Sequence, residues 1–310
     1  MVMAMAVAAL RRAVVAACAV AAAHAAWGEI RLRDDRGVEV RLAQPASRIV
    51  SLAPYLTELA FAAGAGSKLV GVSAFSDFPP EAKQVPVISD STHVDYEALV
   101  RLKPDLILGW RSGNRARDLA QLETRGYRLF VTEPSRLADV PRILRTIGEL
   151  AGTRAQADAA AAAIEARLAA LKAQHAGARQ LAVFYEIWHE PLMTVNGRHY
   201  VSAMLELCGG RNVFAAAAPL TPVVSREQLL AADPDVILLS TVPAREADAL
   251  AAWRRWPTLR AVKAGALYPI DSGLTSRMGA RVADGAAAIC AALEEARRGS
   301  ATPAATGSPR

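Results

Sequence analysis

The chain has 310 residues, of which 53% are hydrophobic and 21% are charged, a composition that excludes a disordered protein and suffices for two apolar cores. Its formal net charge of +6 comes from scattered rather than clustered Lys and Arg residues, so it has no footprint for nucleic-acid binding. Two domains are therefore expected, with no nucleic acid as a partner.

The N-terminal segment predicts an export signal. It has no acidic residue among its first 26, carries a pair of arginines, and then runs apolar from Ala13 to Ala23. An A-x-A cleavage site ends at Ala25, so residues 1–25 are interpreted as a signal peptide. The apolar run is shorter than the roughly 20 residues that span a bilayer. Cys18 loosely matches a lipoprotein cleavage box, and lipid anchoring there stays open as the minor alternative.

Short β-rich runs alternate with amphipathic segments from residue 48 onward. In the first half of the chain they are RIVSL (48–52), LVGVS (69–73), DLILGW (105–110) and RLFVTE (128–133). This alternation predicts βαβ units on a mainly parallel sheet. Residues 46–136 are therefore assigned to an N-terminal α/β lobe.

Two helices are expected to connect the halves, within residues 137–176. The first covers roughly Leu137–Leu150, and the second covers Arg154–Gln174, a stretch without Gly or Pro that consists almost wholly of strong helix formers. The second helix should be about 30 Å long at 1.5 Å per residue. Such a rigid joint predicts limited movement between lobes. His175 is expected at its exposed end.

The β-rich runs begin again in the second half, at LAVFYEI (181–187), LMTVN (192–196), DVILLS (235–240) and ALYPID (266–271). They define a C-terminal α/β lobe over residues 177–297. The predicted fold class is thus α/β, with two Rossmann-like lobes that have mainly parallel sheets and are joined by a single long α-helix. Residues 298–310 are small, polar and Pro-containing, and are predicted to be a disordered tail.

An internal repeat relates the two lobes. EALVRLKPDLIL (97–108) and EQLLAADPDVIL (227–238) share Glu, Leu, Pro-Asp and an apolar strand at the same offsets. Each segment predicts a short helix with Glu in its first turn, where the helix dipole favours an acid, and the helix ends before the Pro. Glu97 and Glu227 then form a matched pair on one face of the protein. The alternative is that each is simply a good first-turn residue.

Motifs of common catalytic sites are absent. The chain has no H-E-x-x-H, C-x-x-C, G-x-S-x-G or G-x-x-x-x-G-K-[ST] motif. The histidines after the signal follow no zinc spacing: His93, His175, His189 and His199. We therefore expect that the protein is not an enzyme and has no resident metal or other cofactor.

Two cysteines remain after removal of the signal, Cys208 and Cys290, in a chain that is bound for an oxidising compartment. A disulfide between them is one interpretation. Two buried thiols are the other, because a sequence does not give the distance between two Cα atoms.

The chain from about Arg48 to Ala296 resembles the periplasmic cobalamin-binding proteins of bacterial ABC importers, within a wider class that also binds ferric siderophores and haem. The segments that carry the resemblance are SLAPYLTELAFAAGAGSKLVGVSAFSDFPPEA (51–82), YEALVRLKPDLILGWRSGN (96–114), LELCGGRNVF (205–214) and VSREQLLAADPDVIL (224–238). The resemblance implies a periplasmic monomer that holds cobalamin or a related corrinoid between its lobes and delivers this ligand to the membrane permease subunits of an ABC importer.

The resemblance also implies roles for single residues. Glu97 and Glu227 correspond to surface glutamates that pair with arginines of the permease subunits, and Cys208 and Cys290 correspond to a disulfide of the family. Trp110 matches a tryptophan of the ligand cleft, and Phe75 replaces a tyrosine there.

The cleft is expected to differ in detail from that of the family. Ser91, Ile187 and Thr221 stand where the family has aromatic residues, and Trp188 is a substitute for the ring missing at position 187. The predicted ligand-binding residues are Phe75, Trp110, Arg111, Tyr185 and Trp188.

Two alternative functions stay open. The first keeps the transport role but changes the ligand, either to haem, with Tyr200 and His189 as candidate ligands, or to a ferric siderophore, with Arg111 and Arg277 as candidates. The second is an exported α/β enzyme or a receptor domain, since fold alone does not fix function.

Overall fold

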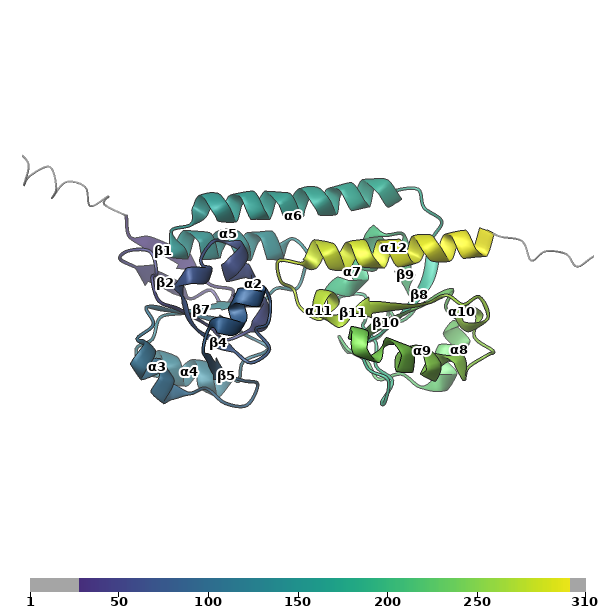
Figure 1. Ribbon diagram of the computed structural model, residues 1–310, viewed down its shortest axis with the longest axis horizontal. Helices are drawn as coiled ribbons and strands as arrows, with labels where there is room; N and C mark the ends of the chain where they lie inside the picture. Colours follow the sequence, from purple (N-terminus) through teal and green to yellow (C-terminus); the bar gives the residue numbers. More distant parts are fainter. Residues whose placement is uncertain (1–27, 302–310) are drawn as a thin grey trace, which may run out of the picture.

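The computed structural model describes residues 28–301 and shows two α/β lobes side by side beneath one long helix (Figure 1). The predicted signal peptide, its cleavage site and Cys18 lie outside the described residues. Within residues 28–301, none of the helices combines the length and the apolar character needed to cross a membrane.

The N-terminal lobe contains a five-stranded parallel sheet in the order β5-β4-β3-β6-β7. Its strands are β3 (Ile49–Ser51), β4 (Leu69–Ser73), β5 (Val87–Ser89), β6 (Leu106–Trp110) and β7 (Leu129–Thr132). Its helices are α2 (Pro54–Ala62), η1 (Gly66–Lys68), η2 (Pro80–Gln84), α3 (Tyr96–Leu102) and α4 (Ala116–Thr124). The four strands predicted for this lobe are confirmed.

The C-terminal lobe contains a four-stranded parallel sheet in the order β11-β10-β8-β9. Its strands are β8 (Leu181–Glu186), β9 (Gly210–Asn212), β10 (Val236–Thr241) and β11 (Leu267–Asp271). Its helices are α7 (Tyr200–Leu207), α8 (Arg226–Ala232), η3 (Pro243–Arg245), α9 (Glu246–Arg254), α10 (Arg260–Lys263), α11 (Ser272–Thr275) and α12 (Val282–Ala301). Pro269 is tolerated in β11 because this strand lies at the sheet edge.

The strand predicted at residues 192–196 is wrong. Met193 forms only isolated bridges, with Trp188 and Val223. The backbone N–H groups of Thr194 and Asn196 bond to the loop at residues 220–222 instead of to the sheet. The edge position beside β8 is therefore taken by β9, which the sequence did not predict.

The two linking helices lie where the sequence predicts them, as α5 (Asp139–Ala151) and α6 (Arg154–His175). They approach closely at Gly148, where an added Cβ would lie only 2.2 Å from the Cβ of Ala157. The expected exposure of His175 is wrong. Its side chain is buried because it lies against α12, where its Nδ1 is 3.5 Å from Glu294 Oε1.

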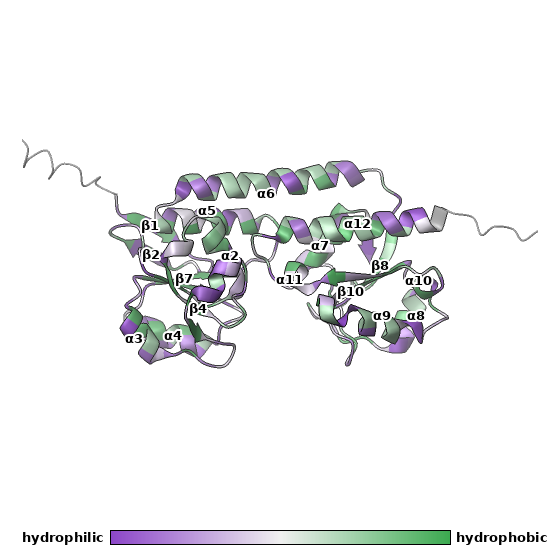
Figure 2. Ribbon diagram, in the orientation of Figure 1, coloured by the Kyte–Doolittle hydropathy of each residue, from purple (hydrophilic) through white to green (hydrophobic). Residues whose placement is uncertain are grey.

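One apolar core runs through both lobes beneath α6. It includes Ile143 and Ile147 of α5, Leu205 of α7, and Ile289 and Leu293 of α12. Smaller separate cores lie under α3 and α4 in one lobe and under α8, α9 and α10 in the other. Figure 2 shows hydrophilic and hydrophobic residues intermixed along α6, as expected for a helix that covers a core with one side only. The lobes are therefore joined by packing as well as by the chain.

Helix α12 is fixed at its middle and near its C-terminal end. Cys290 forms a disulfide with Cys208, with the two Cα atoms 4.8 Å apart, so the disulfide that the resemblance implied is present. Arg297 donates hydrogen bonds to the carbonyl oxygens of Arg179 and Cys208, at 2.9 and 2.7 Å. The helix continues to Ala301, so the prediction of disorder is wrong for residues 298–301. Residues 302–310 lie outside the described part.

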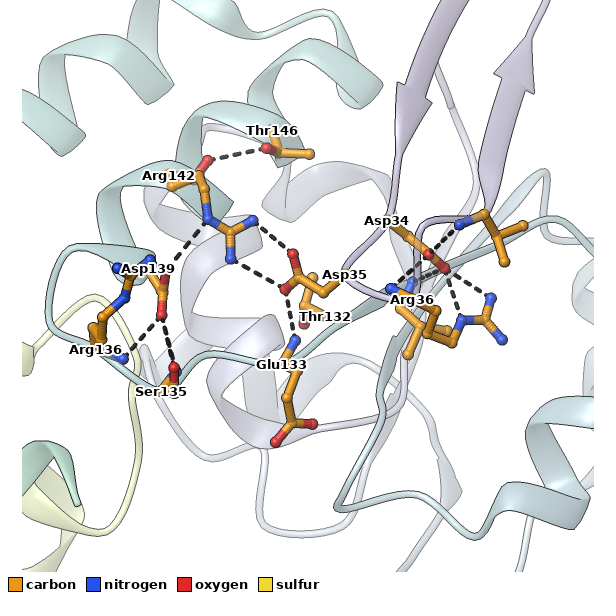
Figure 3. A network of polar contacts seen from close by, with 12 residues as sticks. Asp34, Asp35, Arg36, Thr132, Glu133, Ser135, Arg136, Asp139, Arg142 and Thr146 are labelled. Carbon is orange, nitrogen blue, oxygen red and sulfur yellow. Dashed lines mark hydrogen bonds and ion pairs between the residues drawn. The ribbon is translucent and has the colours of Figure 1, made fainter. Parts of the chain in front are cut away.

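A hairpin that the sequence did not predict precedes the N-terminal lobe and consists of β1 (Ile30–Arg33) and β2 (Glu39–Leu42). Figure 3 shows how its turn is attached. The Asp34 carboxylate accepts a hydrogen bond from Val131 N at 3.3 Å. Asp35 accepts from Glu133 N at 2.7 Å and from the Arg142 guanidinium at 2.8 Å. The hairpin thus packs onto the N-terminal lobe, ahead of the predicted start at residue 46.

Candidate functional site

The carboxyl ends of parallel strands from both sheets border a cavity between the lobes. Its volume is about 340 Å³, and it is lined from the N-terminal lobe after β4 and from the C-terminal lobe after β10 and β11 by Asp77, Phe78, Val242, Asp271, Ser272, Gly273, Ser276, Arg277 and Arg281. Ligands of open α/β sheets bind at this edge of the strands. The inter-lobe cleft around this cavity is the candidate ligand site.

Phe75 lies in the loop after β4 and is 78% exposed. Its φ of 63° falls in the left-handed region, which is rare for a bulky residue and costs on the order of 1–3 kcal/mol. Buried hydroxyl groups hold the loop in place, with Ser76 Oγ 2.9 Å from Thr57 Oγ1 and 3.3 Å from Ser73 Oγ. Because these groups are anchored in the interior, the ring is presented at the surface, where it can cover an apolar ligand.

Trp110 ends β6 and packs edge-to-face on Tyr55, with ring centroids 5.6 Å apart. Gly113 is required beside the ring, because an added Cβ would lie 1.8 Å from Trp110 Cε3. Asn114 fixes the turn, since its Oδ1 accepts from Trp110 N at 2.7 Å and its Nδ2 donates to Leu52 O at 2.8 Å. The Trp-Arg-Ser-Gly-Asn segment therefore holds the tryptophan ring at the carboxyl edge of the sheet.

Arg111 and Trp188 also follow the carboxyl ends of strands, β6 and β8 respectively. Trp188 is 60% exposed, and its indole Nε1 donates to Glu190 O at 2.7 Å, which fixes the ring at the surface. Arg111 is exposed, and its backbone N donates to Thr132 O at 3.0 Å. Both side chains stay candidates for ligand contact.

Tyr185 does not reach the cleft. Its side chain is buried in the core shared by both lobes, and its Oη donates to Thr275 Oγ1 at 2.8 Å. Burial raises the pKa of this phenol. The neighbouring Phe184 packs on the other side of the sheet, against α9. We therefore correct the predicted ligand role of Tyr185 to a structural one.

A charge cluster beside the cavity joins the two lobes, and sequence reasoning missed it. Glu58 of α2 has a side chain only 1% exposed, and its Oε1 accepts from Arg281 at 2.7 Å and from Arg277 at 3.4 Å. Arg277 also donates to Asp77 at 2.7 Å. The Arg281 guanidinium lies 3.9 Å from the centroid of the Phe78 ring. Two acids of one lobe thus neutralise two arginines of the other.

The sequence offered little signal for this cluster. Arg277 and Arg281 are four residues apart, but Glu58 precedes Arg277 by 219 residues, and its position in α2 gives no hint of a partner. These contacts weaken the case for Arg277 as a siderophore ligand. In this structure its guanidinium is paired with Glu58 and Asp77 and is not a free cation.

The two helices of the repeat are built alike. α3 and α8 each have seven residues, with Glu97 and Glu227 at the second position. The Asp95 side chain caps α3, and Ser225 caps α8 in a capping box. Both helices end two residues before the Pro. Pro itself disfavours helical backbone only at the residue directly before it, so each helix ends one residue earlier than the Pro requires. The predicted helix, turn and strand order of the repeat is confirmed.

The Pro-Asp turns of the repeat also have one structural role. The Asp105 carboxylate accepts from Arg48 N at 3.0 Å, and the Asp235 carboxylate accepts from Ala182 N at 2.8 Å. Each aspartate therefore ties the start of its own strand, β6 or β10, to the start of the neighbouring strand, β3 or β8.

Glu97 and Glu227 are exposed, and no ion pair involves either of them within residues 28–301. A hydrogen bond from the Ser225 side chain lowers the pKa of Glu227. Figure 1 shows α3 and α8 at the lower edges of the two lobes, on the side of the molecule away from α6. The structure thus displays one unpaired carboxylate per lobe on the same side of the protein.

The residues considered as haem ligands make contacts within the protein. Tyr200 Oη donates to Thr275 O at 2.6 Å, and burial raises the pKa of the phenol. His189 Nδ1 lies 3.1 Å from Glu186 Oε1. Over residues 28–301, no three His, Cys, Asp or Glu side chains gather in a way that suits a metal ion.

Comparisons with known proteins give one consistent result. The sequence model of the family described as periplasmic binding protein matches residues 49–274. The chain is 32% identical over 255 residues to the vitamin B12-binding protein of Vibrio cholerae, across 82% of this chain and 91% of the relative. It is 37% identical over 193 residues to the vitamin B12-binding protein of Photorhabdus laumondii, across 62% of this chain and 70% of the relative.

Solved structures extend these similarities to the fold. The periplasmic vitamin B12-binding protein of Vibrio cholerae superposes with a TM-score of 0.76 at 33% identity, across 82% of this chain and 99% of the other. A periplasmic haem-binding protein from Pseudomonas aeruginosa gives a TM-score of 0.70 at 27% identity, across 80% of this chain and 92% of the other. The predicted fold class, α/β with two lobes, is therefore confirmed.

Proposed function

The chain belongs to the periplasmic binding protein family, and on this premise we propose that it captures cobalamin or a related corrinoid in the inter-lobe cleft and delivers it to the permease subunits of an ABC importer. The observation that carries the proposal is the combination of an inter-lobe cleft with two equivalent exposed glutamates, one in each lobe. An enzyme has no need of the second feature. The family and the relatives are binding proteins, which agrees with the expectation that this chain is not an enzyme.

The aromatic residues around the cleft suit contact with the flat face of a large ligand. Phe75, Trp110 and Trp188 lie at the carboxyl ends of strands from both sheets, and aromatic rings contribute much apolar area to such a contact. Arg111 adds an exposed cation at the same edge. Cobalamin is then the transported ligand and not a resident cofactor, and the protein acts as a periplasmic monomer after removal of its signal peptide.

A ligand titration tests the identity of the cargo. We expect the mature protein to bind cyanocobalamin with a Kd below about 1 µM in calorimetry, and to bind haemin and a ferric hydroxamate siderophore at least about 100-fold more weakly. Replacement of Trp110 by Ala should weaken cobalamin binding. Absence of heat with cyanocobalamin, or tighter binding of haemin with a shifted Soret band, would refute the cobalamin assignment.

A docking measurement tests the delivery role separately. In a variant with Glu97→Ala and Glu227→Ala, we expect unchanged cobalamin affinity but loss of docking to the reconstituted permease. Docking of the unmodified protein should weaken as salt rises, because the contact depends on complementary charge. A variant that loses cobalamin binding but still docks would show that the glutamates belong to the cleft.

A further inference from the structure

Each repeat helix carries an exposed aliphatic residue one turn after its glutamate. Val100 is 62% exposed on α3, and Leu230 is 42% exposed on α8. Val100 lies three positions after Glu97, and Leu230 lies three positions after Glu227. Side chains at this spacing are neighbours on a helix surface, with Cβ atoms about 5–6 Å apart. Each lobe therefore presents a carboxylate and an apolar side chain next to each other.

The two copies of the repeat have the same residue at six of their twelve positions, and the fold explains most of these. Leu99 and Leu229 are fully buried and anchor their helices to the core. The Pro-Asp turns tie the strands that follow to the neighbouring strands of each sheet, as described above for Asp105 and Asp235. The helix dipole favours an acid in the first turn, but the fold gives no such reason for the exposed aliphatic residue that follows it in both copies.

The other exposed positions of the two helices differ. Arg101 is matched by Ala231, and the exposed Arg226 and Gln228 of α8 are matched by the half-buried Tyr96 and the buried Ala98 of α3. A single exposed aliphatic residue is ordinary on a protein surface. The same residue class at the same offset from the same acid in two otherwise divergent helices indicates instead a surface that has one use in both lobes.

We propose that Val100 and Leu230 form the apolar half of the permease docking surface, an inference that rests on the proposed function. Each supports the aliphatic stem of a basic side chain of the permease, and the charged head of that side chain pairs with Glu97 or Glu227. Arginine suits this arrangement, because its methylene stem packs on apolar surface while its guanidinium binds a carboxylate through two parallel hydrogen bonds. The partner is thus a membrane protein with two equivalent basic sites, one for each lobe.

The test compares three variants for docking to the reconstituted cobalamin permease in lipid nanodiscs, at low and high salt. The first combines Val100→Ser and Leu230→Ser, the second combines Glu97→Ala and Glu227→Ala, and the third is the control Val38→Ser, at an aliphatic position 45% exposed in the hairpin. We expect the first to weaken docking about tenfold at both salt concentrations, since burial of apolar area is not screened by ions. The second should lose most at low salt, and the control should match the unmodified protein.

The outcomes separate this inference from the proposed function. If the serine variant docks normally while the glutamate variant does not, the apolar role is overturned and the delivery role stands. If neither variant loses docking, the delivery role itself is wrong. Equal weakening by Val38→Ser would also overturn the inference, because it would reveal a general surface effect. A Val100→Leu variant, which keeps an aliphatic side chain, should retain docking, and cobalamin affinity should be unchanged throughout.

Discussion

At the carboxyl end of β6 the Trp110 ring lies so close to the backbone of Gly113 that one methyl group decides where the ring sits. We predict that Gly113→Ala displaces the ring and weakens cobalamin binding roughly tenfold, with a loss of stability of about 1–3 kcal/mol from overpacking. Calorimetric titration and urea unfolding measure the two effects. Gly177→Ala is the matched control, because nothing lies within 4 Å of the Cβ it would add. Normal binding by the Gly113 variant would show that Trp110 is not a ligand contact.

His199 links the stability of the protein to pH. Burial lowers the pKa of His199 to about 4 from its ordinary value of 6.5. The unfolded chain therefore takes up a proton below pH 6.5, whereas the folded protein does so only near pH 4. This contribution to stability is complete above pH 6.5 and is lost as the pH falls toward 4, by up to about 1.4 kcal/mol per pH unit.

The matched variant is His199→Asn. Its side-chain oxygen can replace His199 Nδ1, which accepts from Val201 N at 3.2 Å and caps α7, but it does not titrate. Urea unfolding at pH 7.5, 5.5 and 4.5 should show a smaller loss of stability in the variant than in the unmodified protein. Equal losses in the two proteins would mean that other groups cause the pH dependence.

Among single residues, the ligand contacts predicted for exposed rings are compatible with the structure and stay predictions, whereas the contact predicted on β8 is wrong. Phe75 and Trp188 are at the surface, as ligand contacts require, whereas Tyr185 is buried. A parallel strand that is covered on both faces lacks the alternation of polar and apolar residues that reveals direction. Tyr185 was therefore indistinguishable in the sequence from a residue that faces the cleft.

At the scale of elements, the aspartates of the repeat connect the starts of neighbouring strands. Asp105 accepts from the backbone N of Ser47 at 2.8 Å, from Ser47 Oγ at 2.8 Å and from Arg48 N at 3.0 Å. We predict that Asp105→Ala lowers the free energy of unfolding by about 2–3 kcal/mol, because backbone N–H donors lose a charged acceptor. Asp105→Asn keeps one acceptor oxygen and should cost less. Urea unfolding measures both, and a loss below about 0.5 kcal/mol for the alanine variant would contradict the assigned role.

The element boundaries were predictable where apolar runs are bounded by turn residues. This holds for β4, β6 and β10, and for α6, which has no Gly or Pro inside it. The hairpin β1–β2 was missed because its strands have four residues each and are rich in charge. Its position depends on Asp34 and Asp35, whose partners lie about a hundred residues away in the chain.

For the whole molecule, the Glu58 cluster fixes one lobe against the other. We predict that Glu58→Gln lowers the free energy of unfolding by roughly 3 kcal/mol, because two partly buried arginines lose a charged partner. It should also broaden the distribution of distances between spin labels placed in the two lobes. Asp77→Asn is the control, since this more exposed carboxylate should contribute less than about 1 kcal/mol. A larger effect from Asp77 than from Glu58 would contradict this account.

The two-lobe plan was predictable from the alternating elements and from the run of helix formers between them. The contacts between lobes were not, because they join residues that no local pattern relates. Glu58 and Arg281 are 223 positions apart, and the shared core combines α5 and α7 with α12. The sequence thus predicted a rigid connection between the lobes from α6 alone. The structure adds a second connection beside the cleft, the ion pairs of Glu58 with Arg277 and Arg281.

Because α6 and the Glu58 cluster both hold the lobes together, we expect the separation of Glu97 and Glu227 to stay nearly constant whether or not the cleft is filled. Under the proposed function, an importer that binds these two glutamates would have little means of recognising an empty binding protein by its shape. Empty copies of the binding protein would then compete with filled copies for the same docking site on the importer. The rate of uptake would depend on the ratio of binding protein to ligand. A cell that makes more binding protein than it has ligand would slow its own import of the ligand.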